Sequence, residues 1–415
     1  MLDWYRDLSG AGRATFWACF AGFALDALDV QIYSFVIPTM IGLALLTREQ
    51  AGIIATSTLV LSAFGGWFAG MLADRFGRVR TLQITVLWFA VFTAACGLTT
   101  GFYPLLICRS LQGLGFGGEW AAGSVLMGEV IAARHRGRAV GFVQSSWSVG
   151  WGVAAILATI ILRVVPPAYA WRALFFVGLL PALVTFAIRR YVPEPAPFVR
   201  AHTAGRAPGT LAIFGPHLWW TTLRCSVLAL GAQGGYYSIT TWLPTFLRTE
   251  RHITVMGSLS YLMVVIVGSF CGYVFSAYLC DAVGRRLNFL MFAVCSAGVV
   301  FLYTHVAISD AVMLVLGFPL GFFASGVFSG MGPTFTELYP TELRGAGQGF
   351  CYNAGRGFAA FFPTLVGSAS AVLPLGAAIG YFAVIAYGLM AVAALTLPET
   401  RGRELATWAD MTGGH

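Results

Sequence analysis

The chain of 415 residues is 58% hydrophobic and only 10% charged, whereas about a quarter of the residues of an average soluble domain are charged. Together with a mean hydropathy of +0.77, this composition excludes an ordinary soluble enzyme, a disordered chain and a coiled coil, and it indicates an all-α membrane protein. The net charge of +8 is not gathered into a basic run or a basic patch with interleaved aromatics, so nucleic acid is not an expected partner.

Twelve apolar segments follow one another along the chain. A hydrocarbon core of about 30 Å requires about 20 apolar residues in a helix. On this measure we predict twelve transmembrane helices, near residues 15–40, 51–73, 80–100, 103–131, 139–163, 172–190, 220–247, 257–280, 287–305, 310–337, 346–370 and 379–397. The first of them is too long, and too interrupted by carboxylates, for a cleaved signal peptide.

The basic residues indicate how the chain is oriented. All 25 are arginines, and 17 of them fall in segments that are cytoplasmic if the N-terminus is cytoplasmic, against five in the outer loops. Cytoplasmic loops of membrane proteins are enriched in basic residues. We therefore expect a multi-pass protein of the bacterial inner (plasma) membrane with both termini in the cytoplasm.

The chain also repeats itself with a period of half its length. The recurring sets are Asp74, Gly77 and Arg78 with Asp281, Gly284 and Arg285; Glu129, Arg136 and Gly137 with Glu337, Arg344 and Gly345; and Pro193-Glu194 with Pro398-Glu399. Two six-helix bundles in the same orientation are related by a pseudo-two-fold axis along the membrane normal. We predict an N-terminal bundle over residues 1–190, a cytoplasmic linker over 191–219, and a C-terminal bundle with a short cytoplasmic tail over 220–415.

The loop after the second predicted helix carries the most specific motif. It reads Gly70-Met-Leu-Ala-Asp74-Arg75-Phe-Gly77-Arg78, and a reduced copy begins at Asp281, where Ala277 replaces the leading glycine. This loop is similar to the signature loop of the major facilitator superfamily, and the resemblance covers the whole chain. It implies the superfamily's fold of two pseudo-symmetric six-helix bundles and a transport function by alternating access.

Two further motifs narrow the resemblance. The fourth helix, from Arg109 through Gln112, resembles the superfamily's motif for proton coupling, and Gly117-Gly118-Glu119-Trp120 resembles the metabolite:proton and sialate:proton symporters of organic anions. The glutamate after the glycine pair favours those branches over the aromatic-acid carriers. The proline-glycine signature of antiporters is missing from the fifth helix, which disfavours drug efflux.

Four ionisable residues are candidates for proton coupling. Charged side chains inside a membrane cost about 2.5–3.5 kcal/mol each on insertion scales, so central ones are functional candidates. Asp26 and Asp29 are three residues apart and share a helix face, Arg109 lies at a similar depth, and Glu119 lies nearer the cytoplasm. The alternatives are that Asp29 only neutralises Arg109 and that Glu119 belongs to an internal ion pair. All six histidines fall in loops or at helix ends, so carboxylates are the expected proton carriers.

Arg356 in the eleventh helix is the candidate for substrate binding, because a guanidinium can hold a carboxylate through two parallel hydrogen bonds. Tyr352 and Asn353 lie within one turn of it. The alternative is a structural ion pair, for instance with Asp26. A second cluster in the seventh helix either lines the substrate cavity or only packs, and it comprises Gln233, Tyr236 and Tyr237.

The charged loops are candidates for gating rather than for substrate contact. Ion pairs at the cytoplasmic ends can hold the two halves together in the outward-open state. We expect Glu129 with Arg136, and Glu337 with Arg344, to join this network. The gating set is Gly70, Asp74, Arg75, Gly77, Arg78, Glu129, Arg136, Asp281, Gly284, Arg285, Glu337 and Arg344.

The expected function is proton-coupled uptake of a small organic anion, such as a sialate-like, monocarboxylate or aromatic carboxylate substrate, by a monomer in the lipid bilayer. The alternatives are an antiporter or efflux carrier on the same fold and a membrane sensor that does not transport. No nucleophile–base pair lies within the spans, and the eight cysteines lie in apolar segments without metal-ligand spacing. We therefore expect no enzyme activity, no metal and no cofactor besides the proton gradient.

Overall fold

The structure is a computed structural model that describes residues 3–180, 194, 209–252, 255–306 and 308–412. Within these ranges every regular element is helical. Eight of the described helices are long and apolar enough to span a membrane. The remaining spans are less apolar or lie partly outside the described residues. Three of them carry most of the polar residues of the candidate site described below.

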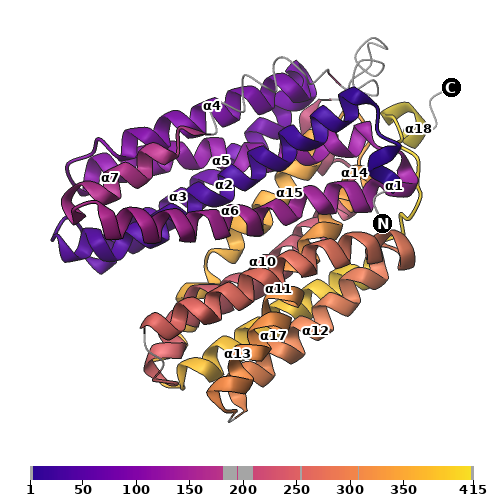
Figure 1. Ribbon diagram of the computed structural model, residues 1–415. Helices are drawn as coiled ribbons and strands as arrows, with labels where there is room; N and C mark the ends of the chain where they lie inside the picture. Colours follow the sequence, from indigo (N-terminus) through magenta and orange to yellow (C-terminus); the bar gives the residue numbers. More distant parts are fainter. Residues whose placement is uncertain (1–2, 181–193, 195–208, 253–254, 307, 413–415) are drawn as a thin grey trace.

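The N-terminal half forms one bundle, drawn in indigo to magenta in Figure 1. Each predicted span in this half coincides with a helix, and the end of the sixth span, residues 181–190, lies outside the described residues. The helices are α1 (Asp3–Arg6), α2 (Gly10–Gly42), α3 (Arg48–Phe76), α4 (Arg78–Cys96), α5 (Phe102–Val130), α6 (Arg136–Val164) and α7 (Pro167–Val177).

The C-terminal half forms the second bundle, and two of its predicted spans are broken helices. The tenth span is α13 (Asp310–Gly326), a 3₁₀ turn and α14 (Met331–Leu338), and the eleventh is α15 (Arg344–Ala359) and α16 (Phe362–Ala369). The remaining helices are α10 (Trp219–Thr249), α11 (Val255–Val283), α12 (Arg285–His305), α17 (Leu375–Thr396) and the short α18 (Trp408–Thr412). The fold of twelve spans in two six-helix bundles predicted from the sequence is confirmed. Most of the predicted linker, residues 191–219, lies outside the described residues.

The two bundles meet at the end of the molecule where both termini lie and diverge toward the opposite end (Figure 1). At the meeting end α3 packs on α15 and α6 packs on α11. A Cβ atom on Gly70 would lie 2.2 Å from the carbonyl oxygen of Gly345, and one on Gly141 would lie 2.6 Å from the Cβ of Ala277. Small residues therefore permit the close approach of helices from different halves.

The glutamate of the repeated Pro-Glu motif caps a helix in each half. Gly77 and Gly284 turn the chain from one helix to the next with φ values of 108° and 100°, which favour glycine. Glu194 accepts hydrogen bonds from the first N–H groups of α4 at 2.9 and 3.0 Å, and Glu399 accepts from those of α12 at 2.9 and 3.1 Å. Partial burial opposes the charge of Glu399, but the backbone N–H groups outweigh it and lower the pKa of this carboxyl.

Candidate functional site

Asp29 lies inside the N-terminal bundle and is the counter-ion of Arg109. Its carboxylate accepts a hydrogen bond from Gln112 and lies 3.7 Å from the Arg109 guanidinium. Both charged side chains are almost completely buried, and the guanidinium also lies 4.4 Å above the ring of Tyr33. A Cβ on Gly178 would come within 2.8 Å of the Asp29 oxygen, so α7 closes this pair off. Asp29 and Arg109 therefore neutralise each other within one bundle.

Asp26 faces a different partner, Glu119 of α5. The two carboxyl groups interact directly, and Gly22 makes room for them, because a Cβ there would lie 2.3 Å from a Glu119 oxygen. Asp26 is 0% exposed, and no donor among the described residues contacts either of its oxygens. Two facing carboxyl groups form a hydrogen bond only when one of them carries a proton, so this pair is suited to holding one.

Arg356 of α15, in the C-terminal bundle, lies in the same region. Its charge attracts that of Asp26, and its Nη1 donates to the side-chain oxygen of Asn353 at 3.2 Å. The guanidinium lies 4.6 Å from the ring of Phe116 in the other bundle and 5.0 Å from that of Tyr352. Its Nε has no hydrogen-bond partner among the described residues. A buried guanidinium with an unused donor can bind an anion.

Aromatic side chains from both bundles surround this guanidinium. Trp120 stacks on Tyr352 with ring centroids 3.6 Å apart and planes inclined by 16°. Trp147 of α6 lies 5.3 Å from Phe23 and 6.2 Å from Phe116. The sequence analysis missed these residues as site candidates. A signal was available for Phe23 and Phe116, which lie three positions before Asp26 and Glu119 and therefore on the same helix faces.

The other predicted substrate residues divide into two groups. Gln233 donates to the backbone oxygen of Tyr352 at 2.8 Å, and Asn353 donates to Gly349 at 3.0 Å and is almost in contact with Gly66. Gln233 thus joins α10 to α15, and a longer bond from Asn353 to the backbone oxygen of Gly117, at 3.4 Å, joins α15 to α5. Tyr236 and Tyr237 are half-buried and face the interface between the bundles, with Tyr237 next to Arg356. These two tyrosines therefore remain available to contact a substrate.

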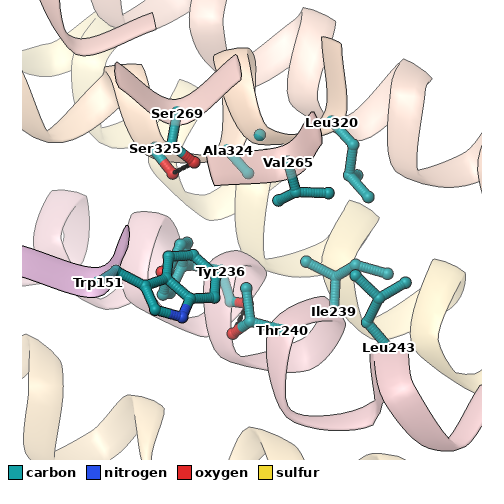
Figure 2. Close-up of a pocket in the computed structure, with 11 residues that line it drawn as sticks. Trp151, Tyr236, Ile239, Thr240, Leu243, Val265, Ser269, Leu320, Ala324 and Ser325 are labelled. Atoms are coloured by element: carbon teal, nitrogen blue, oxygen red, sulfur yellow. Dashed lines mark hydrogen bonds between the residues drawn. The ribbon is translucent and has the colours of Figure 1, made fainter. Parts of the chain in front are cut away.

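Tyr236 also borders a small cavity between α6 and the C-terminal bundle (Figure 2). Trp151 closes it on one side, and the bonded hydroxyl pair of Ser269 and Ser325, 2.9 Å apart, lies on the other. The cavity leaves about 10 Å³ for the centre of a water molecule, so it holds one water at most. In this conformation the two bundles are nearly in contact here.

The predicted gating residues lie where the bundles meet, and each half supplies an aspartate to the start of a helix in the other. Asp74 accepts bonds at 3.0 and 2.7 Å from N–H groups at the start of α15. Asp281 accepts equivalent bonds at 3.0 and 2.9 Å at the start of α6. Arg78 and Arg285 bind the same aspartates at 3.1 and 2.9 Å. Helix N-termini favour negative charge, so these contacts hold the halves together.

The buried glutamates Glu129 and Glu337 lie in this network, and each pairs with one arginine of its own half and one of the other half. Glu129 accepts from Arg344 of the other half at 2.6 Å, and Glu337 accepts from Arg136 at 3.0 Å. All four side chains are at most 2% exposed. The eight residues Asp74, Arg78, Glu129, Arg136, Asp281, Arg285, Glu337 and Arg344 are called the latch below. Arg75, also in the predicted gating set, is exposed over the ring of Phe76 and has no latch contact among the described residues.

Comparison with known proteins agrees with this architecture. Residues 19–363 match the family model of the Major Facilitator Superfamily. The chain is 40% identical to a probable 4-methylmuconolactone transporter of Cupriavidus pinatubonensis over 97% of this chain and 94% of that protein. It is 29% identical to a cis,cis-muconate transport protein of Acinetobacter baylyi over 86% and 87%. The structure of the proton:xylose symporter XylE superposes with a TM-score of 0.83 at 18% identity, covering 97% and 98% of the two chains.

Proposed function

Because the chain belongs to the major facilitator superfamily of membrane transporters, we propose that it imports a small unsaturated carboxylate together with a proton. The observation that carries this proposal is the position of Arg356. A single buried guanidinium with an unused donor lies between aromatic rings of both bundles and beside a pair of carboxyl groups.

The surroundings of Arg356 suit a planar anion. The guanidinium supplies charge and directional hydrogen bonds for a carboxylate, and the rings of Phe116, Tyr352 and Trp120 supply flat apolar surfaces for a conjugated or cyclic body. The hydroxyls of the half-buried Tyr236 and Tyr237 interact with Trp147 and Arg356 and can exchange these contacts for a second polar group on the substrate. Relatives named for cis,cis-muconate and 4-methylmuconolactone transport support this class of substrate.

Coupling to protons follows from competition for Arg356. An ionised Asp26 attracts the guanidinium and opposes binding of a second negative charge. A proton on the pair of Asp26 and Glu119 removes this competition, so substrate binding and protonation favour each other. Release of the proton then restores the attraction and weakens the hold on the substrate.

Closing and opening of the latch separates the two access states of the transporter. In this structure the latch closes the end at which both termini lie, and the arginine distribution assigns that end to the cytoplasm. Separation of the bundles at this end breaks the pairs between Glu129 and Arg344 and between Glu337 and Arg136. In the proposed cycle this conformation is the state closed toward the cytoplasm, from which the bundles rock to release substrate and proton inside.

The test is transport of cis,cis-muconate by the purified protein in proteoliposomes that enclose a pH-sensitive dye. Substrate added outside should acidify the lumen and accumulate there when the outside is more acidic. Substrate uptake accompanied by alkalinisation of the lumen would instead indicate antiport. Saturable binding without counterflow of labelled substrate would indicate a sensor, and either result would overturn the proposal.

A further inference from the structure

A second cavity lies on the far side of Glu119, inside the N-terminal bundle. Its polar lining consists of Glu119, Ser124 and Gln144, and apolar side chains of α2, α4 and α6 complete the wall. The cavity leaves about 20 Å³ for the centre of a water molecule, which is sufficient for about one water. Glu119 is 3% exposed, and its Oε2 has no hydrogen-bond partner among the described residues.

The polar groups of this cavity are the kind that bind a water. Gln144 accepts a hydrogen bond from Trp120 at 2.9 Å, so its NH₂ group remains a donor. Ser124 donates to the backbone oxygen of Trp120 at 2.7 Å and accepts from Gln348, so one lone pair of its oxygen remains an acceptor. With the carboxyl of Glu119 these groups give a water the two to four partners that a buried water requires.

The cavity also lies next to the interface between the bundles. Along α5 the order is Glu119, then Ser124, then Glu129 of the latch. The amide of Gln348 in the other bundle donates to the Ser124 hydroxyl at 2.5 Å, and Thr336 donates to the oxygen of Gln348 at 3.3 Å. Gln348 therefore contacts the cavity wall at Ser124 from the other bundle, and a neutral amide does not carry an excess proton readily.

We propose that this cavity is a water site through which Glu119 releases its proton, and that Gln348 blocks this route while the latch is closed. The inference rests on the proposed function. The O–H bond of the Glu119 carboxyl breaks, the proton passes to the water, and the carboxylate remains. When the bundles part at the latch, Gln348 leaves Ser124 and the water connects with the cytoplasm. Protons therefore leave only in the state that also releases substrate.

The titratable groups around Glu119 fit this route. Cys19 and Asp26 of α2 face it, and Arg356 of α15 acts on Asp26 from the other bundle. The residues of α4 and α6 that line the cavity are not titratable. In the pair of Asp26 and Glu119, Asp26 therefore faces the substrate region and Glu119 faces the water site.

Gly123→Val tests the water directly, because the new side chain fills the cavity. A Cβ at Gly123 meets no atom closer than 4.0 Å. In proteoliposomes, uptake of cis,cis-muconate driven by a pH gradient should fall about tenfold or more, while counterflow of labelled substrate, which needs no proton release, stays near the wild-type rate. Gly388→Val is the matched control, since its Cβ also meets nothing within 4 Å and its position on α17 is exposed.

Gln348→Ala tests the block and needs no substrate. Liposomes containing this variant should dissipate an imposed pH gradient faster than wild-type liposomes, because water then joins the cavity to the latch end. Normal gradient-driven uptake by Gly123→Val, or a wild-type leak rate in Gln348→Ala, would overturn the inference. Failure of the proposed function would be seen separately, as absence of proton movement with substrate in the wild type.

Discussion

Asp26 and Asp29 are three residues apart on one helix and have different surroundings. Asp29 is bound by Gln112 and paired with Arg109 within its own bundle, whereas Asp26 faces another carboxyl group and is attracted by Arg356 of the opposite bundle. Three residues correspond to about 300° of rotation, so the two side chains differ in direction by about 60°. This offset is enough to make one aspartate a fixed counter-ion and the other a group that can respond to the partner bundle.

The largest effect is expected at Arg356, the cation of the opposite bundle that acts on Asp26. Arg356→Lys keeps the charge but loses the planar fork that holds a carboxylate. The loss of one charged hydrogen bond of about 2–3 kcal/mol corresponds to a decrease in kcat/KM for cis,cis-muconate of about 100-fold. The measurement is initial uptake in proteoliposomes, and normal transport would show that the substrate is bound elsewhere.

The two aspartates themselves give a matched pair of variants. Asp26→Asn should abolish accumulation against a gradient while counterflow continues, because the neutral amide mimics the protonated acid. Asp29→Asn leaves the buried charge of Arg109 without its partner, which costs about 3–5 kcal/mol of stability. Its main effect should therefore be a lower melting temperature in detergent, with coupling retained in the folded fraction. The comparison fails if both variants lose coupling equally.

A smaller effect is expected at the latch. Asp74→Asn weakens the bonds to the start of α15 and one of the contacts that hold the halves together. We expect turnover to fall about tenfold, equivalent to about 1.4 kcal/mol in the barrier between the two states, with KM almost unchanged. Asp281→Asn is the equivalent change in the other half and should lower turnover in the same way. A large increase in KM with unchanged kcat would contradict the assignment of these residues to gating.

The smallest effect is expected at the helix caps. Glu399→Gln removes a charged cap from α12 and should reduce stability by at most about 1 kcal/mol, since the residue is partly exposed. The pKa of Glu399 is lowered in the folded protein, so its contribution is present at neutral pH and is lost as the pH falls through the folded-state pKa. Melting curves of wild type and variant should converge at acidic pH. A constant difference at all pH values would exclude the charge as the cause.

The fold was predictable because the bilayer constrains it. A helix of about 20 residues satisfies its own backbone hydrogen bonds in lipid, so the lengths of the apolar segments are sufficient to count the spans. The repeated motifs were sufficient to place the loops at one end. The breaks within the tenth and eleventh spans were not foreseen, because they leave the total apolar length unchanged.

The site was predictable only in part, because contacts between helices depend on rotation and on which bundle a side chain faces. Charge at mid-depth alone was sufficient to name Arg356 and Asp26 as candidates. The pairing of Glu129 with Arg344 of the other half was not foreseen, because sequence position says nothing about pairing across the interface. The ring stack of Trp120 on Tyr352 joins residues more than 200 positions apart, and no local pattern indicates it.

The most direct test of the central claim is the pH dependence of substrate binding. Binding of cis,cis-muconate to the purified protein can be followed through tryptophan fluorescence, since Trp120 and Trp147 lie at the site. If protonation of the carboxyl pair frees Arg356, the wild-type affinity should fall as the pH rises, and Asp26→Asn should bind tightly at every pH. A wild-type affinity that does not change with pH, or the same pH dependence in the variant, would contradict the account.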